Sequence, residues 1–306
     1  MRLSVVHETL YRYDQAVESS HHLAHLSPQS DAMQTVHAHR IDIDPAPTCG
    51  DLTQRFDRWG NLATHWFMAQ THPHLRVAAY SQIETRVCPE AISEISCQQA
   101  SRLLHQDLNL GRAEALRWVY PSIRVPQHPE FSDLARPDLA PERPLVEAAV
   151  AFMQRLHGQF TYDAQSTQVH TPALSALREQ RGVCQDFAHI MLAGLRQMGQ
   201  AACYVSGYLL THPPPGQARL RGADASHAWV ALHIPHLNDH PSRGWLHLDP
   251  TNARYGWGSP GADYVVLARG RDFSDVSPLR GVLRGGSDSA PRVSVHVEPK
   301  IGRAHV

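Results

Sequence analysis

The first part of the chain alternates between apolar and polar residues, which is the pattern of strands that bury one face. Three segments show this alternation: residues 3–13, 37–43 and 75–87. The segment Asp57-Arg58-Trp59-Gly60-Asn61 stands between apolar neighbours and has the composition of a hairpin turn. We therefore predict a β-sandwich-like domain over residues 1–125, with a short helix within residues 91–116.

Prolines then separate this region from the next. Six fall within 25 residues: Pro121, Pro126, Pro129, Pro137, Pro141 and Pro144. Proline lacks a backbone donor and clashes inside a helix, so we predict a linker or wrapping segment at residues 126–145. The remaining residues, 146–306, form the predicted second domain, which includes a final strand at residues 293–297.

The second domain mixes helical and strand periodicities. Apolar residues at helical spacing predict helices over residues 145–156 and 173–178, and a third from Cys184 to the stop signal at Gly199. Strand patterns follow at residues 201–210, 226–234, 245–249 and 264–268. A strand-rich region followed by mixed helices and strands predicts an α+β fold.

Cys184 is the first candidate for chemistry because it opens a predicted helix. A thiol in the first helical turn lies beside unpaired N–H groups and the positive end of the helix dipole. Both favour the thiolate and can stabilise an oxyanion. A lone cysteine is nevertheless more often a packed small residue than a nucleophile. A catalytic thiolate also needs a base and a group that orients the base.

Two predicted strands can supply those groups. If residues 226–234 and 245–249 form a hairpin centred near Asn238, constant-sum pairing sets His227 opposite Asp249. Directly opposed side chains have Cβ atoms roughly 4.5–5.5 Å apart, close enough for an imidazole to donate to a carboxylate. A slip of one residue would turn one of them to the other face. The hairpin therefore predicts a His–Asp pair.

Composition limits the remaining possibilities. The 306 residues have a formal net charge of −1, which gives no reason to expect nucleic acid or an anionic membrane as a partner. No apolar run approaches about 18 residues, and the first residues lack the apolar core of a signal peptide. Five cysteines without metal-like spacing suit a reducing compartment, so we expect a cytoplasmic protein.

Several strings of residues resemble the bacterial transglutaminase-like proteins of the papain-like cysteine superfamily. They are Arg181-Gly182-Val183-Cys184-Gln185-Asp186-Phe187-Ala188-His189, Ser206-Gly207-Tyr208, Ser226-His227-Ala228-Trp229, Asp249-Pro250-Thr251-Asn252, Gly270-Arg271-Asp272, Asp275-Val276, Pro278-Leu279-Arg280-Gly281, Tyr11-Arg12-Tyr13 and Trp59-Gly60-Asn61. The resemblance covers nearly the whole chain. It implies an N-terminal β domain and a core in which the cysteine helix packs on an antiparallel sheet.

The resemblance also implies roles. Cys184 would be the nucleophile, His227 the general base and then acid, and Asp249 the orienting carboxylate. A side chain upstream of Cys184 would supply a second oxyanion donor, which the sequence does not identify. One departure is Asp263-Tyr264, where the family leads us to expect a histidine, and we do not expect this change to touch the triad.

Other residues have competing interpretations. Trp229 would share a strand face with His227 and either shield its ring or fill the core. Gln185 and Asp186 could contact substrate, although Asp186 could equally complement the helix dipole. The other thiols are interpreted as packed or idle: Cys49, Cys88, Cys97 and Cys203. The 22 histidines include His21, His22 and His25, but lack the glutamate of a metalloprotease helix, so we predict no metal site.

These observations predict thiol-dependent acyl transfer on a peptide or protein amide, without an organic cofactor. Water would make the protein a peptidase or amidase, and an amine acceptor would make it a transglutaminase-type enzyme. A binding or scaffold module on the same fold is the alternative from another class. An arylamine acetyltransferase-like enzyme is less favoured, because that family places its cysteine nearer the N-terminus. The oligomeric state stays open.

Overall fold

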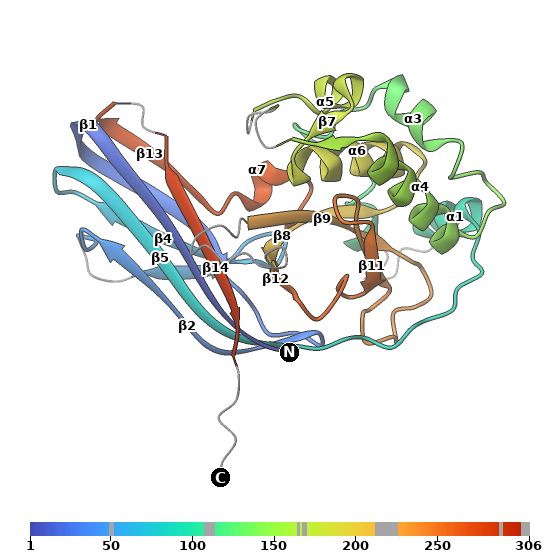
Figure 1. Cartoon of the computed structure of the whole chain (residues 1–306), viewed down its shortest axis with the longest axis horizontal. Coiled ribbons are helices and arrows are strands. Elements are labelled where there is room, and N and C mark those ends of the chain that lie inside the picture. The colour runs from blue at the N-terminus through green and yellow to red at the C-terminus, as the bar shows by residue number, and fades with distance from the viewer. Residues whose placement is uncertain are drawn as a thin grey trace, which may run out of the picture.

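The computed structural model describes residues 1–48, 52–106, 114–163, 166, 170–211, 226–287 and 290–300. A large curled antiparallel sheet and a smaller sheet covered by helices form its two regions (Figure 1). The predicted α+β class, with a strand-rich N-terminal region and a helix-bearing core, is confirmed. Cys49 lies outside the described residues.

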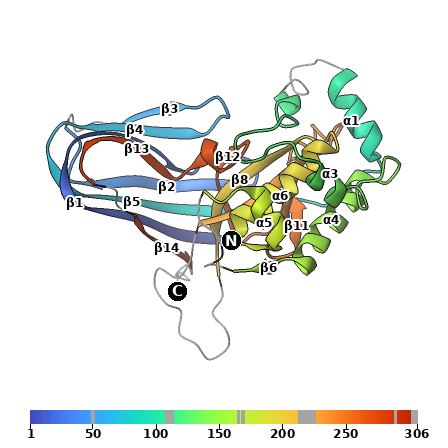
Figure 2. The same ribbon diagram turned by 90° about the horizontal axis from the view of Figure 1, so that it is seen from above.

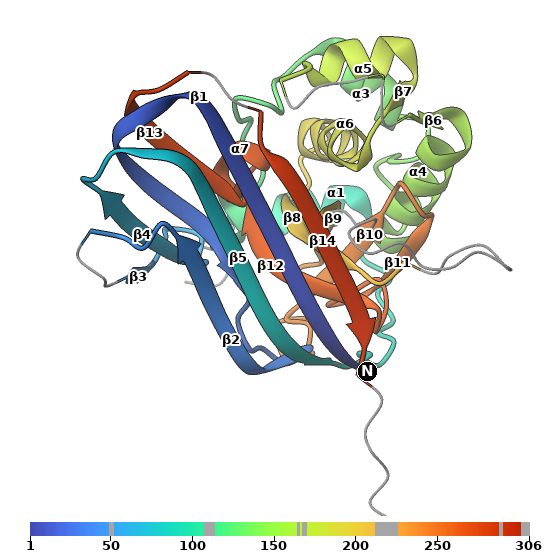
Figure 3. The ribbon, with the colours of Figure 1, turned by 60° about the vertical axis from the view of Figure 1, so that its left-hand side comes forward.

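The N-terminal sheet is organised by β1, a strand of 26 residues. Its strands are β1 (Arg2–Ser27), β2 (Gln34–Asp44), β3 (Thr53–Phe56), β4 (Leu62–Met68), β5 (His72–Thr85), β13 (Leu279–Gly285) and β14 (Arg292–Pro299). The first half of β1 pairs with β5 and β14, and the second half pairs with β4 and β13. Register shifts along β1 increase twist and bend, which curls the sheet (Figure 3).

The end of the chain therefore returns to the N-terminal sheet. We expected the final strand to belong to the second domain, but β14 pairs with β1 from Leu3↔Pro299 to Leu10↔Arg292. Val295 and Val297 of β14 are buried in the same apolar cluster as Leu3 and Val5. The burial of these valines explains why β14 lies beside β1. Alternation within β14 alone predicts a strand but does not specify which strand it pairs with.

The core sheet is antiparallel, with the order β11-β10-β9-β8-β12. Its strands are β8 (Ala202–Leu209), β9 (Ser226–His233), β10 (Trp245–Asp249), β11 (Arg254–Trp257) and β12 (Tyr264–Gly270). The helices are α1 (Cys97–Gln106), α3 (Pro129–Ala135), α4 (Leu145–Gln159), α5 (Ala173–Glu179), α6 (Cys184–Gln197) and α7 (Phe273–Val276). Helix α6 packs against one face of β8 and β9 and is almost wholly buried.

The proline-rich segment differs from a plain linker because it contains helix α3. Pro129 is tolerated in the first turn, where its missing N–H costs no helical bond, and His128 accepts a bond from the Glu130 N–H. Phe131 and Ala135 of this helix are buried against the neighbours of α6. The segment therefore wraps the core and contributes to its packing.

Two amide side chains attach the N-terminal region to the core sheet. Gln34 exchanges two hydrogen bonds with the backbone of Val266, and Asn61 does the same with the backbone of Arg269. Each side-chain amide thus donates to a β12 carbonyl and accepts from a β12 N–H, as the backbone of a neighbouring strand would. A buried bond of 3.1 Å between His7 and Tyr208 also joins the two regions.

Candidate active site

Cys184 opens α6, as predicted, and is half-buried. The carboxylate of Asp186 accepts a hydrogen bond of 2.9 Å from the Val183 N–H, which caps the first turn of α6. Gly182 permits this arrangement, because a Cβ there would lie 2.6 Å from Asp186 Oδ2. The turn therefore holds the thiol at the helix start while its side chain stays accessible.

His227 reaches both of its expected partners. Its Nε2 donates to Asp249 Oδ2 over 2.7 Å, and Cys184 lies close enough to the ring to raise the pKa of His227. Since Nε2 faces the carboxylate, Nδ1 is the nitrogen left for the thiol. The structure thus brings together the three predicted residues.

The strand register behind this contact differs from the prediction. Strand β9 pairs with β10 as Leu248↔Val230 and Trp245↔His233, two residues away from the expected alignment. A shift of two keeps every side chain on its face, so His227 and Asp249 meet diagonally instead of directly. In the loop between the two strands, His236 and Arg243 adopt left-handed backbone conformations. The centre of the hairpin therefore does not lie at the position near Asn238 that the prediction assumed.

Asp249 is fully buried and collects several donors. Its Oδ2 accepts bonds of 2.7 Å from both the Asn252 amide and the Tyr264 hydroxyl, in addition to His227. Its Oδ1 accepts the Thr251 N–H. The expectation that the Asp263-Tyr264 departure lies away from the triad was therefore wrong, because Tyr264 on β12 lies beside β8 and aims its hydroxyl at the carboxylate.

These bonds set the charges of the pair. Burial alone would lower the pKa of His227, but the bonds and charges of Asp249 and Cys184 raise it to about 10. Burial alone would raise the pKa of Asp249, but the donors His227, Asn252 and Tyr264 hold it below its ordinary value. Burial and the adjacent carboxylate raise the pKa of Tyr264, which keeps its hydroxyl a donor. At neutral pH the site holds an imidazolium against a carboxylate.

Trp229 packs beside the imidazole and is wholly buried. Its ring lies 5.9 Å from that of His227, nearly parallel, and its Nε1 donates to His247 Nδ1 over 2.8 Å. A Cβ at Gly207 would lie 2.5 Å from the Trp229 ring, so this glycine makes room for the indole. Trp229 therefore both fills the core and covers one side of the imidazole.

Gln185 and Asp186 are both buried in the first turn of α6, and the bond to Val183 gives Asp186 a structural task. A residue that the sequence did not single out also lies near Cys184. Strand β6 (Thr161–Tyr162) pairs in parallel with β7 (Arg181–Gly182), which brings Tyr162 alongside the turn before Cys184. Burial and the charge of Cys184 raise the pKa of Tyr162. The pairing of two two-residue strands has no periodic signal, so only coordinates reveal it.

The other candidates lie away from this site. Cys88, Cys97 and Cys203 are buried free thiols. Arg271 pairs with Asp275, while Asp272 caps α7 and accepts the Arg124 N–H, as a structural turn would. Among the described residues, no group of three or more His, Cys, Asp or Glu side chains could hold a metal ion.

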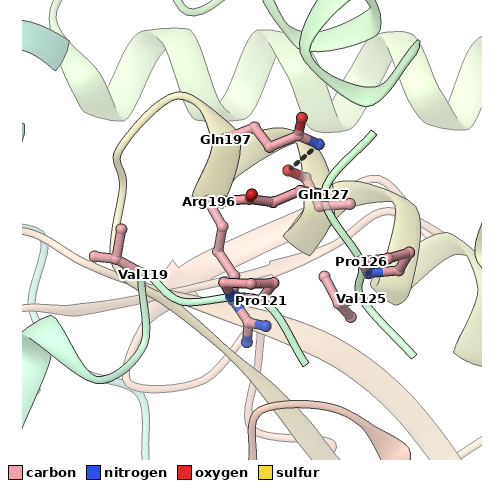
Figure 4. A pocket seen from close by; sticks show the side chains of 8 residues that line it. Val119, Pro121, Val125, Pro126, Gln127, Arg196 and Gln197 are labelled. Carbon is pink, nitrogen blue, oxygen red and sulfur yellow. Dashed lines mark hydrogen bonds between the residues drawn. The ribbon is translucent and has the colours of Figure 1, made fainter. Parts of the chain in front are cut away.

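The far end of α6 offers no room for a substrate. A cavity of about 10 Å³, enough for roughly one water molecule, lies beside Arg196 and Gln197 (Figure 4). The Arg196 guanidinium is buried and donates to the carbonyls of Ala202 and Arg271. This end of the helix is therefore structural.

Family models match both regions of the chain. The bacterial transglutaminase-like N-terminal region matches residues 3–84, and the transglutaminase-like superfamily matches residues 133–250. The uncharacterised protein Rv2569c of Mycobacterium tuberculosis is 37% identical over 309 residues, covering 99% of this chain and 94% of that protein. The uncharacterised protein ML0607 of Mycobacterium leprae is 30% identical over 285 residues, covering 93% and 94%.

A solved structure shares the fold. It is a candidate cysteine protease from Cytophaga hutchinsonii, with a TM-score of 0.72 and 16% identity, covering 98% of this chain and 92% of that one. The chain therefore belongs to the bacterial transglutaminase-like family, and its core has the transglutaminase-like fold. No helix among the described residues is long and apolar enough to cross a membrane.

Proposed function

We propose that the protein is a thiol-dependent acyl-transfer enzyme that acts on a peptide or protein amide through Cys184, His227 and Asp249. The observation that carries the proposal is the position of His227, which bonds Asp249 over 2.7 Å and lies close enough to Cys184 for the thiol to raise the pKa of the imidazole. The family and the fold support an enzyme of this general type.

In the proposed reaction, the Cys184 thiolate attacks the amide carbonyl carbon, and the carbonyl electrons move onto oxygen. The backbone N–H of Cys184 at the helix start is the first oxyanion donor. The hydroxyl of Tyr162 is our candidate for the second. As the tetrahedral intermediate collapses, the C–N bond breaks and His227 gives its proton to the leaving amine. A thioester on Cys184 and a neutral imidazole remain.

The second half of the reaction resolves the thioester. His227 removes a proton from water or an acceptor amine, which attacks the thioester carbonyl and releases the Cys184 thiolate. Water yields a carboxylic acid, and an amine yields a new amide. Throughout, Asp249 holds Nε2 of His227 and stabilises its positive charge. The proposed enzyme needs no organic cofactor, and four free thiols suit a reducing, cytoplasmic setting.

The competing function is a non-catalytic module that uses the same fold for binding. The position of His227 between Asp249 and Cys184 favours the enzyme, because a binding surface needs no aligned thiol, imidazole and carboxylate. The test is a screen of γ-glutamyl, peptide and isopeptide substrates, each with and without an amine acceptor, against wild type and Cys184→Ala. Turnover that needs Cys184 supports the enzyme, whereas no turnover of any substrate, with intact labelling of Cys184 by iodoacetamide, supports the module.

A further inference from the structure

A second cavity lies on the N-terminal sheet, separate from the triad residues. Its volume is about 330 Å³, within the range of small-ligand sites. The walls come from β1, β3, β4, the turn after β3, α7 and β13. Figure 2 shows β3, β4 and β13 gathered along one side of this sheet. Two of the family-like strings, around Trp59 and around Arg280, meet here, and the proposed reaction uses neither.

The charges of the lining favour an anion. Arg55, Arg58 and Arg280 face Asp57 and Asp275, so the formal charge is +1 with the histidines counted as neutral. Asp57 is already occupied, because it accepts the N–H groups of Trp59 and Asn61 within its own turn. Asp275 is likewise paired with Arg271 over 2.9 Å. Arg58 also lies 3.7 Å from Asp275, and Arg280 donates to the Ser274 carbonyl, so the excess positive charge of the lining rests mainly on Arg55.

An arginine cluster around Trp59 strengthens this positive character. The guanidinium carbons of Arg58, Arg117 and Arg271 lie 4.9, 5.3 and 5.2 Å from the centre of its ring. Cations held over an aromatic ring lose little further freedom when they meet an anion. The side chain of Arg55, in contrast, forms no hydrogen bond or ion pair within the described part of the chain, so its guanidinium is available to a ligand.

The apolar part of the lining defines the rest of the ligand. Phe56 is 70% exposed, although it lines the cavity together with Leu23. An exposed aromatic ring beside an unpaired arginine suits a short aliphatic stem that ends in a carboxylate.

We propose that this cavity is a recognition site for the carboxylate of a glutamate side chain in an acidic peptide, with Arg55 as the main contact. The inference does not depend on the catalytic role of Cys184. Guanidinium groups bind carboxylates through two parallel hydrogen bonds, and Phe56 covers the stem.

Isothermal titration calorimetry tests the site with the full chain. The ligands are an acetylated triglutamate amide, its triglutamine counterpart and glutarate. We expect the triglutamate peptide to bind at least about tenfold more tightly than the triglutamine peptide, and Arg55→Ala to remove at least about tenfold of that affinity. Arg40→Ala, on the other side of β5, is the matched control, since Arg40 is exposed and does not line the cavity.

Each of the other outcomes of the calorimetry either supports or overturns the proposed carboxylate site. Unchanged binding by Cys184→Ala, together with loss in Arg55→Ala, supports the site even if the proposed enzyme fails. Glutarate binding as tightly as the peptide, with the same dependence on Arg55, supports the carboxylate site and identifies a free dicarboxylate as its ligand. Equal binding of triglutamate and triglutamine, or equal loss in Arg55→Ala and Arg40→Ala with unchanged melting temperatures, overturns the proposal.

Discussion

Helices α1 and α6 each begin at a cysteine, Cys97 and Cys184 respectively. Cys97 is buried, and its N–H donates to the Arg143 carbonyl over 3.0 Å. Burial raises the pKa of its thiol to about 11. Cys184 is half-buried and lies close enough to His227 to raise the pKa of its ring, and the Cys184 N–H has no acceptor among the described residues.

The difference between the two cysteines shows how far the start of a helix determines the reactivity of a thiol. Both thiols lie near the positive end of a helix dipole, an effect of roughly 0.3–1 kcal/mol. At Cys97, burial outweighs both the dipole and the charge of the nearby Arg143. At Cys184, an imidazolium and partial exposure accompany the dipole. The neighbours of a cysteine therefore decide its chemistry more than its place on a helix does.

Removing each thiol gives the largest expected contrast. Cys184→Ala should lower turnover of any substrate found in the screen by more than about 10³-fold, because no other group can form the thioester. Cys97→Ala should leave turnover within about twofold. The measurement is kcat/KM for both variants, and comparable losses in both would contradict the assignment of the nucleophile.

Removing the imidazole should have the next largest effect. His227→Ala should reduce kcat/KM by about 10²–10⁴-fold, the contribution of a positioned acid and base. Its circular dichroism spectrum should match that of the wild type, which shows that the fold persists. The matched control is His240→Ala, whose ring lies 3.9 Å from the Cys88 sulfur. If His240→Ala lost as much activity as His227→Ala, the assignment of His227 as the acid and base would be contradicted.

The carboxylate should control how stability depends on pH. The folded-state pKa of His227 is about 10, above its ordinary 6.5, so its contribution is fully present below about pH 6.5 and is lost as pH rises through about 10. Asp249→Asn should flatten this decline in the free energy of unfolding, measured by urea denaturation between pH 6 and 10. Tyr264→Phe keeps the carboxylate, so it should retain the slope and lose about 1–2 kcal/mol throughout. An unchanged slope in Asp249→Asn would contradict the charged pair.

The smallest expected effect concerns the turn that presents Cys184. Gly182→Ala should destabilise the fold by about 1–3 kcal/mol, because the added Cβ collides with the Asp186 carboxylate. Gly158→Ala is the control, since nothing lies within 4 Å of its added Cβ inside α4, and it should stabilise by up to about 1 kcal/mol. Thermal unfolding measures both. Equal shifts would show that Asp186 does not constrain the turn.

Local pattern was sufficient for much of this architecture. Helical spacing after Cys184 predicted α6, and alternation predicted the first half of β1 and all of β9, because those periods reflect which face is buried. The pairing of β14 with β1 was not predictable, since many edges can accept an alternating strand. The same holds for the donation from Tyr264 to Asp249, which depends on the position of β12 next to β8.

Alternation also explains why the His227–Asp249 contact was predicted from the wrong register. An error of two residues in the register of β9 and β10 leaves every side chain on the same face of the sheet. His227 and Asp249 were therefore correctly predicted to meet, although the predicted strand register was wrong. Tyr162 was missed because its parallel pairing with the segment before Cys184 spans two residues only.

The most direct test follows the alkylation of Cys184 and Cys97 by iodoacetamide from pH 5 to 10, with each site quantified by mass spectrometry in the native wild-type protein. We predict that Cys184 already reacts at pH 6, with a rate that changes little up to pH 8, while Cys97 stays unmodified until the protein is denatured. A Cys184 rate that rises only with the titration of an ordinary thiol, near pH 8.5, would contradict the account.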